Sequence, residues 1–366
     1  MKIKTSAKAL KGAISKLKLL PNTQLLAGSI LIIQVDEMDG MTIARRTGNY
    51  EAELQIDCET DGSGFLYLDM SFLDNAATGT EDVIEIESSG RLSVVVKNGK
   101  RKTTITQFPE QEVIAKAAAS DTNKTTTLPV EVLIEAIRVC SNATAEDKGR
   151  EDLMHMDIRR VGKNISFVAT DGRRAHVYTP DIEIKVEAVI PSVAIRCLRS
   201  MFEQEEKIIL TETGSGAITF ASGGTRILCP KVEAKTPSLD KMLDIPEASN
   251  IIKFNRSEFA AAIKAAVPFG GNNRIVTIKT AQGIAMIEAG EEADSKARTS
   301  TEVNCECKAP GDSMSFRSDY FIDMLDAIGT NEIELEWIAD RSCFHYKDAE
   351  RQIMLMGIRI QPSSAK

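Results

Sequence analysis

The sequence predicts an α+β fold in which three similar units follow one another along the chain. One helical pattern recurs at intervals of about a third of the 366 residues, and a second helix recurs between its copies. Short alternating apolar runs separated by turn residues fill the rest. Each third has room for two helices and roughly six to eight short strands, the size of one domain. Three such units in a row favour an arc or a ring.

The first recurring helix carries the pattern Leu/Phe-x-x-Ala-Ile. Its copies begin at Leu10, Leu133 and Phe259, which lie 123 and 126 residues apart. Apolar residues at this spacing fall on one face of an α-helix. Ser6 is a plausible N-cap of the first copy, and Asn255 or Ser257 of the third, because a side-chain oxygen can accept a bond from an amide of the first turn.

The second recurring helix runs directly into a strand in each third of the chain. Its copies lie within residues 71–87, 193–210 and 319–337. An apolar helical face is followed in each by alternating Ile, Val and Leu residues, which are typical of a half-buried strand. Gly79 and Gly329 follow the first and third copies. Glycine at this position can adopt the left-handed conformation that ends a helix.

Turn residues mark the hairpins and the linkers. Asn98-Gly99 and Gly223-Gly224 each separate two alternating runs, so we expect β-hairpins there. The stretches 110–125 and 236–250 are polar and poor in secondary-structure signals. We therefore predict three domains with the boundaries 1–120, 121–245 and 246–366.

Charge is distributed unevenly along the chain. The net charge is −8, yet residues 2–20 contain six lysines and no acidic residue. This pattern fits a solvated basic helix, and it also fits one face that meets phosphates while the rest keeps the protein soluble. The seven scattered cysteines and the lack of a long apolar run indicate a soluble protein of the reducing cytoplasm.

The sequence offers no arrangement for catalysis. His155, His176 and His345 are not spaced as a metal site, and no Cys-x-x-Cys pair occurs. Cys305 and Cys307 are two positions apart on one predicted strand and so share a face, where thiols usually pack as small apolar groups. A P-loop ending and a Gly-x-Ser-x-Gly elbow are also absent. We therefore expect no enzyme activity, no catalytic residue, no metal and no cofactor.

Two motifs carry a family resemblance. Residues 166–175, SFVATDGRRA, resemble the ATDG-x-R signature of bacterial DNA polymerase III beta subunits, the DNA sliding clamps. Residues 354–360, MLMGIRI, are similar to the closing Met-Pro-Met-Arg-Leu segment of that family. With the three-fold division, the resemblance covers essentially the whole chain. It implies the DNA-clamp fold: three tandem similar domains, each with two inner helices and outer antiparallel sheets.

The resemblance also implies a function. Two chains would meet head to tail in a ring homodimer that encircles double-stranded DNA and acts as a polymerase processivity factor. Contacts with phosphates would be weak, salt-dependent and independent of base sequence. The side chains expected to face the DNA are Lys8, Lys11, Lys16, Arg138, Arg196, Arg199, Arg256 and Lys264. The last predicted helix fits this role less well, because Asp319, Asp323 and Asp326 are acidic.

A pocket for short peptides of polymerases and clamp-loader subunits is implied between the middle and last domains. Its expected wall is Leu153, Thr170, Gly172, Arg173, Arg174, Pro237, Lys241, Met242, Met354, Met356 and Arg359. Methionine suits a surface that accepts several apolar peptides, although Met354 and Met356 also fit plain core packing. The chain departs from the family pattern at Arg173 (usually His), Ala175 (usually larger), Lys241 (usually Arg) and Gly357 (usually Pro), and in its tail QPSSAK.

The head-to-tail contact would bring a basic strand against an acidic loop. The basic side is expected to contain Lys97, Lys100, Arg101, Lys102 and Ile105, and the other side Val267, Phe269, Glu288, Glu291, Glu292 and Asp294. Ion pairs at the rim of such a contact weaken with salt. An ordinary charged hairpin and an acidic loop would look the same in the sequence. The alternative function is a clamp-like DNA-binding accessory protein that does not close a ring.

Overall fold

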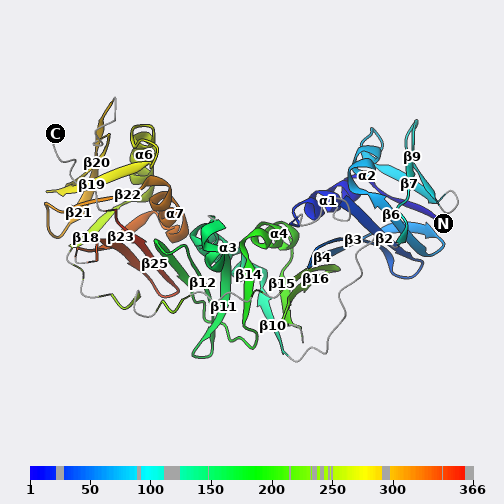
Figure 1. Cartoon of the computed structure of the whole chain (residues 1–366), viewed down its shortest axis with the longest axis horizontal. Helices are drawn as coiled ribbons and strands as arrows, with labels where there is room; N and C mark the ends of the chain where they lie inside the picture. The colour runs from blue at the N-terminus through cyan, green and yellow to red at the C-terminus, as the bar shows by residue number, and fades with distance from the viewer. Residues whose placement is uncertain are drawn as a thin grey trace. The chain divides into compact units, whose positions relative to one another are not determined.

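The structure is a computed structural model, and its described residues form two compact units. It describes residues 1–21, 29–88, 92–110, 124–146, 148–213, 216–230, 232, 237–239, 243–245, 248, 250–290, 297–339 and 341–358. The first unit comprises Met1–Ile134 with Ile184–Glu233, and the second comprises Glu135–Glu183 with Ala234–Lys366. The middle third of the chain therefore contributes to both units (Figure 1). Whether it forms a separate domain stays a prediction.

The order of elements repeats three times, and we call the three copies the first, second and third repeat. The first repeat is β1 (Lys2–Ser6), α1 (Ala7–Lys18), β2 (Ile30–Asp36), β3 (Gly40–Thr47), β4 (Tyr50–Ile56), β5 (Cys58–Asp61), β6 (Gly64–Asp69), α2 (Met70–Ala77), β7 (Val83–Ser88), β8 (Ser93–Asn98) and β9 (Arg101–Thr106).

The second and third repeats follow the same order with four strands between their two helices, where the first repeat has five. The second is β10 (Lys124–Pro129), α3 (Val130–Cys140), β11 (His155–Val161), β12 (Asn164–Thr170), β13 (Arg174–Tyr178), β14 (Ala188–Pro191), α4 (Ser192–Phe202), β15 (Lys207–Glu212), β16 (Ile218–Ser222) and β17 (Thr225–Cys229), with short 3-10 turns η3 (Ser141–Ala143) and η4 (Lys148–Leu153). The third is β18 (Asn250–Asn255), α6 (Arg256–Ala266), η5 (Val267–Phe269), β19 (Ile275–Ala281), β20 (Ile284–Ala289), β21 (Thr299–Cys307), β22 (Ser313–Arg317), α7 (Ser318–Ile328), β23 (Glu332–Ile338), β24 (Cys343–Lys347) and β25 (Arg351–Met356).

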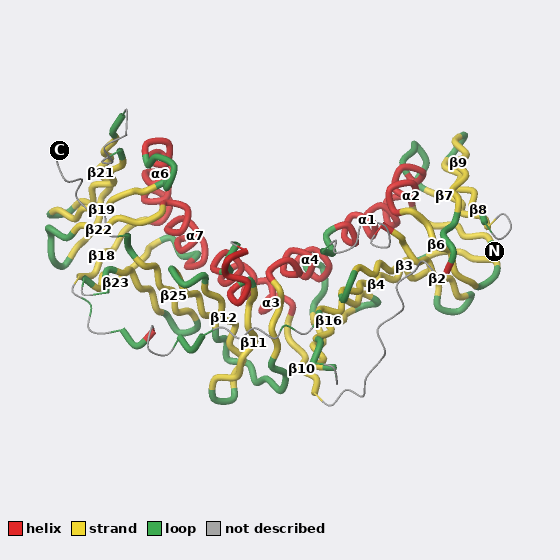
Figure 2. Tube along the Cα trace, in the orientation of Figure 1, coloured by secondary structure: helices red, strands yellow, loops and turns green. Residues whose placement is uncertain are grey.

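Antiparallel sheets join the repeats within each unit. The first unit contains the sheets β5-β1-β7-β8-β9 and β10-β15-β16-β17-β4-β3-β2-β6. The second sheet of this unit passes from the second repeat to the first where Arg226 of β17 lies opposite Glu53 of β4. In the second unit the strands run β11-β12-β13-β25-β24-β23-β18-β21-β20-β19-β22, and Ala175 of β13 lies opposite Met354 of β25. Figure 2 shows the helices of each unit along one side of its strands.

The predicted helices are confirmed in position and in packing. α1, α3 and α6 contain the repeated pattern, and α2, α4 and α7 are the second helices, each leading into a strand. The pattern residues Leu10, Leu133 and Phe259 are all fully buried, as the helical spacing predicted. Ser6 accepts a hydrogen bond from the amide of Ala9, and Asn255 rather than Ser257 caps α6.

The two glycines at helix ends differ. Gly329 has φ +79° and ends α7 in the left-handed conformation, as predicted. The same prediction is wrong for Gly79, whose φ is not positive: α2 ends at Ala77, and its C-cap residue Thr78 has an extended backbone. Gly79 is needed for another reason. A Cβ atom there would lie 2.2 Å from the side-chain oxygen of the buried Asn98.

Both predicted hairpins form. Asn98 lies opposite Arg101, and Gly99 begins the two-residue turn with φ +57°. Ser222 lies opposite Thr225 around Gly223 and Gly224, both of which have positive φ. The predicted linkers fall largely outside the described residues, because 111–123 and much of 231–249 are not described.

The core of the third repeat is aromatic. Phe259 of α6, Phe321 of α7 and Phe316 of β22 stack with ring centroids 4.6 to 5.9 Å apart, and Phe344 meets Trp337 edge to face at 4.9 Å. This packing fixes both helices of the repeat against its strands. Among the helices that the structure describes, each is too short or too polar to cross a bilayer.

Candidate functional site

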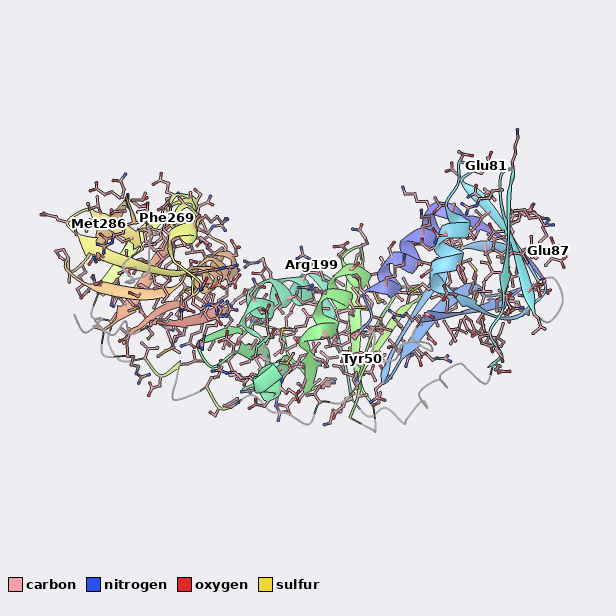
Figure 3. The ribbon with its side chains drawn as sticks, turned by 45° about the horizontal axis from the view of Figure 1, so that its top comes forward. Tyr50, Glu81, Glu87, Arg199, Phe269 and Met286 are labelled. Carbon is pink, nitrogen blue, oxygen red and sulfur yellow. The ribbon has the colours of Figure 1, made fainter. Side chains whose placement is uncertain are left out.

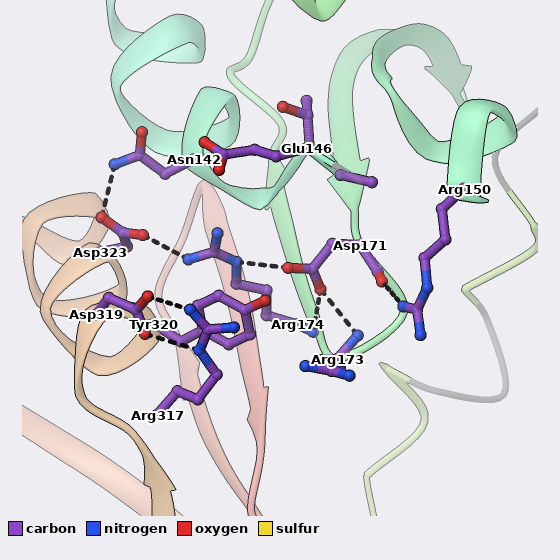
Figure 4. A pocket seen from close by; sticks show the side chains of 12 residues that line it. Asn142, Glu146, Arg150, Asp171, Arg173, Arg174, Arg317, Asp319, Tyr320 and Asp323 are labelled. Carbon is purple, nitrogen blue, oxygen red and sulfur yellow. Dashed lines mark hydrogen bonds and ion pairs between the residues drawn. The ribbon is translucent and has the colours of Figure 1, made fainter. Parts of the chain in front are cut away.

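The candidate site is a cavity of about 440 Å³ in the second unit. It lies where the end of α3, the turn after β12 and the start of α7 come together (Figure 4). Its wall is mostly polar, and its lining residues are Asn142, Thr144, Ala145, Glu146, Arg150, Asp171, Arg173, Arg174, Arg317, Asp319, Tyr320 and Asp323. Three of these, Asp171, Arg173 and Arg174, belong to the ATDG-x-R motif.

The motif forms a tight turn between β12 and β13. The hydroxyl of Thr170 donates to the carbonyl of Arg174 (2.6 Å) and accepts from the amide of Gly172 (3.0 Å). One carboxylate oxygen of Asp171 accepts from the amides of Arg173 (2.9 Å) and Arg174 (3.1 Å). Gly172 has φ +80°, which a residue with a side chain rarely adopts. These bonds explain the residue types of the motif. The side chains of Arg173 and Arg174 then differ: Arg173 is exposed and Arg174 is buried.

Arg174 turns inward and is only 6% exposed. Its guanidinium donates to Asp171 (3.0 Å) and to Asp323 of α7 (2.5 Å), and it lies over the ring of Tyr320 at 4.0 Å. Asp323 also accepts from the side-chain amide of Asn142 (3.0 Å). Burial raises the pKa of Asp323, although Arg174 opposes this shift. The bond from Arg174 to Asp323 thus holds the motif turn against α7.

A second arginine covers the other side of this tyrosine. Arg317 lies over the Tyr320 ring at 4.5 Å and forms an ion pair with Asp319 (2.5 Å). Burial alone would raise the pKa of Asp319, but the hydrogen bonds and charge of Arg317, together with the backbone amide of Tyr320 and the charge of Arg174, outweigh it and lower that pKa. Tyr320 is therefore held between two cations whose charges are already balanced by Asp171, Asp319 and Asp323.

Arg150 and Arg173 are the two remaining arginines of the cavity. Arg150 donates to the backbone carbonyl of Asp171. Arg173 is exposed, and its side chain has no ion pair among the described residues. Its backbone carbonyl accepts from the amide of Met356 (2.9 Å), which ties the turn to the end of β25.

The structure places the predicted pocket residues unevenly. Leu153 and Thr170 are buried next to the turn, Pro237 is exposed and Met356 is half-buried. Met354 is 1% exposed on the interior strand β25, where it packs with Ile338, Cys343 and Leu243, so its side chain belongs to the core. Lys241, Met242 and Arg359 lie outside the described residues.

Gly357 has a local physical explanation. Its amide donates to the carbonyl of Ser342 (2.7 Å), and a Cβ atom would lie 2.8 Å from the side chain of Met314. Proline, which the resemblance leads one to expect at this position, has no amide hydrogen to donate and carries a ring. The bond to Ser342 and the closeness of Met314 therefore explain why glycine replaces the expected proline at position 357.

The predicted DNA-facing residues fall into two groups. Lys8, Arg196, Arg199 and Lys264 have exposed side chains on α1, α4 and α6, and no ion pair is found for them among the described residues (Figure 3 labels Arg199). Lys11 donates to the hydroxyl of Thr78 (2.8 Å), and Lys16 reaches the carbonyl of Met201 at the end of α4 (3.4 Å).

Arg138 and Arg256 are engaged within the second unit. Arg138 binds Glu135 (2.6 Å) and donates to the carbonyls of Asp326 and Ala327, so it closes the C-terminal end of α7. Arg256 lies 3.5 Å from the carboxylate of Asp326. The acidic residues of α7 are therefore balanced by Arg317, Arg174 and Arg256, which the sequence did not indicate.

The residues predicted to contact a second chain have different surroundings in the structure. Lys97 pairs with Glu87 (3.2 Å) in its own sheet, and Lys100 and Lys102 are exposed. Ile105 is 3% exposed and lies in the core of its own repeat. Val267 and Phe269 of η5 are half-buried (Figure 3), and Glu288 pairs with Lys279 (2.5 Å). Glu291, Glu292 and Asp294 lie outside the described residues.

Burial sets the protonation state of several titratable groups. Within the part of the chain that the structure describes, His, Cys, Asp and Glu side chains do not gather as a metal site. Burial raises the pKa of the Cys140 and Cys229 thiols, which keeps them protonated. Burial lowers the pKa of His176 to about 4, so its imidazole is neutral at pH 7.

Sequence reasoning missed several lining residues. Asn142, Arg150, Arg317 and Tyr320 come from four separate elements and meet only in the folded chain. Arg150 carried a weak signal, since it lies three residues before the predicted Leu153. Nothing in the local sequence marked Tyr320.

Comparisons with known proteins agree with the resemblance over the whole chain. Residues 245–355 match the family model for the C-terminal domain of the DNA polymerase III beta subunit. The chain is 23% identical to the beta sliding clamp of Streptomyces coelicolor over 341 residues, which cover 90% of this chain and 88% of that protein. It is 21% identical to the beta sliding clamp of Lactococcus lactis over 334 residues, 85% of each.

Solved structures show the same fold. The beta subunit of the Streptococcus pyogenes DNA polymerase aligns with a TM-score of 0.89 at 18% identity, covering 98% of this chain and 100% of that one. The DNA polymerase III beta subunit of Pseudomonas aeruginosa aligns with a TM-score of 0.87 at 17% identity and the same coverage. The chain is thus similar over most of its length to the DNA polymerase III beta subunits, the bacterial DNA sliding clamps, and its last third matches the model of their C-terminal domain.

Proposed function

We propose that this protein is a sliding clamp: two copies close a ring around double-stranded DNA and tether a polymerase to it. One observation carries the proposal. The same junction between consecutive repeats occurs once in each unit. The two surfaces that such a junction joins are each left unused once, one on the first repeat and the other on the third. Repeats joined in this way need a second chain to use those surfaces.

The two junctions use equivalent strands. In the first unit the last strand of the second repeat, β17, pairs with the fourth strand of the first repeat, β4. In the second unit the last strand of the third repeat, β25, pairs with the fourth strand of the second, β13. Both pairings are antiparallel and extend a sheet from one repeat into the next.

The two junctions also use equivalent helices. Lys16 of α1 reaches the carbonyl of Met201 near the end of α4. Arg138 of α3 reaches the carbonyl of Ala327 near the end of α7. A cation on the first helix of one repeat therefore closes the second helix of the following repeat in both units.

The surfaces left over are the last strand of the first repeat and the fourth strand of the third. Among the described residues, β9 pairs only with β8, and residues 299–304 of β21 pair only with β20. An open strand edge is a template for pairing with another chain. β9 carries exposed Arg101 and Lys102, and the turn before it carries Lys100, whereas residues 299–304 carry exposed Glu302, so the charges of the two edges are complementary.

The register of this contact follows from the repeats. Arg101 corresponds to Thr225, because each is the first residue after a two-residue turn. Cys305 lies opposite Phe254 of β18, and Cys58 lies opposite Thr5 of β1, the equivalent strand. Thr301 and Leu54 lie four residues before these two cysteines, so they correspond to each other. Since Thr225 lies opposite Leu54, Arg101 is expected opposite Thr301 of the second copy, and Lys102 opposite Ser300.

DNA would be held by charge and topology rather than by base contacts. Lys8, Arg196, Arg199 and Lys264 offer exposed cations on the inner helices, while the whole chain has a net charge of −8. Weak phosphate contacts of this kind allow sliding, and a closed ring supplies the residence time.

Partner peptides would bind beside the motif turn. Leu153 lies next to Gly172 there, the backbone of Arg173 is bonded to Met356 at the end of β25, and the half-buried side chain of Met356 offers an adaptable apolar contact. The expected contributions of Pro237, Lys241, Met242 and Arg359 complete this proposed wall.

Primer extension tests the proposal as a whole. On a long circular single-stranded template, the chain should lengthen the products of the polymerase and clamp loader of its own organism, without changing the number of primers used. The proposal fails if product length is unchanged at every concentration of the chain.

A further inference from the structure

We propose that Arg150 and Arg173 form a carboxylate-binding pair that makes the partner site selective for peptides with acidic residues beside their apolar anchors. This inference rests on the proposed function, because it concerns the same peptide site. It adds the chemical class of the peptide and assigns it to two side chains.

Charge balance in the cavity singles out these two arginines. Four arginines and four carboxylates line it. Arg174 is paired with Asp171 and Asp323, and Arg317 is paired with Asp319. Their guanidinium groups are therefore already neutralised by neighbours and offer little to a further anion. Arg150, Arg173 and the exposed Glu146 remain, so this part of the wall has a net positive charge.

The geometry places both arginines next to Gly172. A Cβ atom on Gly172 would lie 3.0 Å from Nη1 of Arg150 and 3.8 Å from Leu153, so the Arg150 guanidinium passes directly over this glycine. Arg173 is the next residue. Figure 4 shows the side chain of Arg150 to the right of Asp171 and Arg173 below it, with Glu146 above and to the left. The fourth carboxylate is thus turned away from the pair.

The two arginines differ in how firmly they are held. Arg150 is half-buried and is fixed by its bond to the Asp171 carbonyl. Arg173 is exposed at the surface, but its backbone is fixed by bonds to Asp171 and Met356. A guanidinium offers several donors in a fixed fork that matches a carboxylate. A peptide lying along Leu153 and Met356 would pass within reach of both.

A selection from a phage-displayed peptide library on the immobilised full chain tests the inference. The library fixes two adjacent large apolar residues as the anchor and randomises the flanks. We expect Asp and Glu to be enriched in the flanks with the wild-type chain, and this enrichment to disappear with the double variant Arg150→Gln, Arg173→Gln. The variant Arg160→Gln, which alters an exposed arginine on β11, is the matched control and should keep the enrichment.

Affinities of a selected peptide and of its Glu→Gln version give the magnitude. Loss of the carboxylates should weaken binding to the wild-type chain by about 3- to 10-fold at 50 mM salt, and by less at 500 mM. Equal affinities in wild type would overturn the inference while leaving the peptide site in place. Failure to enrich any sequence would instead count against the proposed peptide site itself. Circular dichroism of the double variant separates a lost contact from a lost fold.

Discussion

Arg174 illustrates how a residue of the family motif acts through its neighbours. The motif suggested a side chain that meets a peptide, but the guanidinium is buried between Asp171, Asp323 and Tyr320. Its position depends on α7, almost 150 residues further along the chain, so the local sequence could not reveal it. Met354 and Ile105 are likewise buried, Met354 against Ile338 and Cys343 and Ile105 in the core of the first repeat.

Arg174→Gln should therefore destabilise the fold more than it weakens peptide binding. Two buried or partly buried carboxylates would lose their partner, and we expect the free energy of unfolding to fall by about 2–4 kcal/mol. Urea unfolding measures this change. Lys163→Gln removes an exposed pair with Glu183, whose side chains are both 74% exposed, and should change stability by less than about 0.5 kcal/mol. Similar effects for the two variants would contradict the assignment.

His176 makes a prediction about pH. Its Nδ1 donates to the carbonyl of Val139 (2.6 Å), and burial lowers its pKa to about 4. Between that value and the ordinary pKa of about 6.5, the unfolded chain binds a proton that the folded chain does not. Stability contributed by His176 is therefore complete above pH 6.5 and is lost as the pH falls toward 4.

His176→Asn keeps a donor for Val139 but removes this titration. In urea unfolding at several pH values from 4.5 to 6.5, the slope of stability against pH should fall by up to about 1.4 kcal/mol per pH unit relative to wild type. The lower stability that the substitution itself causes is the same at every pH and does not affect the slope. An unchanged slope would show that His176 is protonated in the folded chain.

At the scale of elements, periodicity was a reliable guide. All six helices with the repeated patterns form where the apolar spacing placed them, because burial of one face is a local property of the sequence. The N-caps and hairpin turns were also predictable from residue type. The end of α2 was not, since Gly79 is fixed by the approach of Asn98 from a neighbouring strand.

Two glycine substitutions separate these effects. Gly79→Ala would bring a methyl group within 2.2 Å of the Asn98 side chain, which is buried and hydrogen-bonded to Ala77 and Glu81. We expect a loss of about 1–3 kcal/mol. Gly12→Ala in α1 meets nothing within 4 Å and should stabilise the helix by up to about 1 kcal/mol. Thermal unfolding measures the change in stability of both variants. If both changes had the same sign, the explanation of Gly79 by the approach of Asn98 would be refuted.

At the scale of the whole molecule, the three-fold repeat could be read from the sequence, whereas the surfaces that would join two copies could not. Sequence reasoning proposed a basic strand with Ile105 against an acidic loop with Val267 and Phe269. The strand pairings point instead to complete edges, β9 and residues 299–304, because the equivalent edges are joined in both units. Periodicity identifies a strand, but only its neighbours identify which edge is open.

Cysteine cross-linking tests the register of these edges. In a background with the partly exposed Cys58 and Cys307 replaced by Ser, Lys102→Cys with Ser300→Cys should form a disulfide between two copies. Directly opposite residues lie within the range of a disulfide. Lys102→Cys with Glu302→Cys is offset by two residues, lies beyond that range and serves as the control. Preferential cross-linking of the offset pair would contradict the register.

Retention on DNA of different topology tests the central claim most directly. The chain is loaded onto nicked circular plasmid by its clamp loader and separated from unbound protein by gel filtration, before and after a single cut by a restriction enzyme. A closed ring predicts that the chain stays with the circle and leaves within minutes once the DNA is linear, at the same salt concentration. Equal retention on circular and linear DNA would contradict the account and identify an ordinary DNA-binding protein.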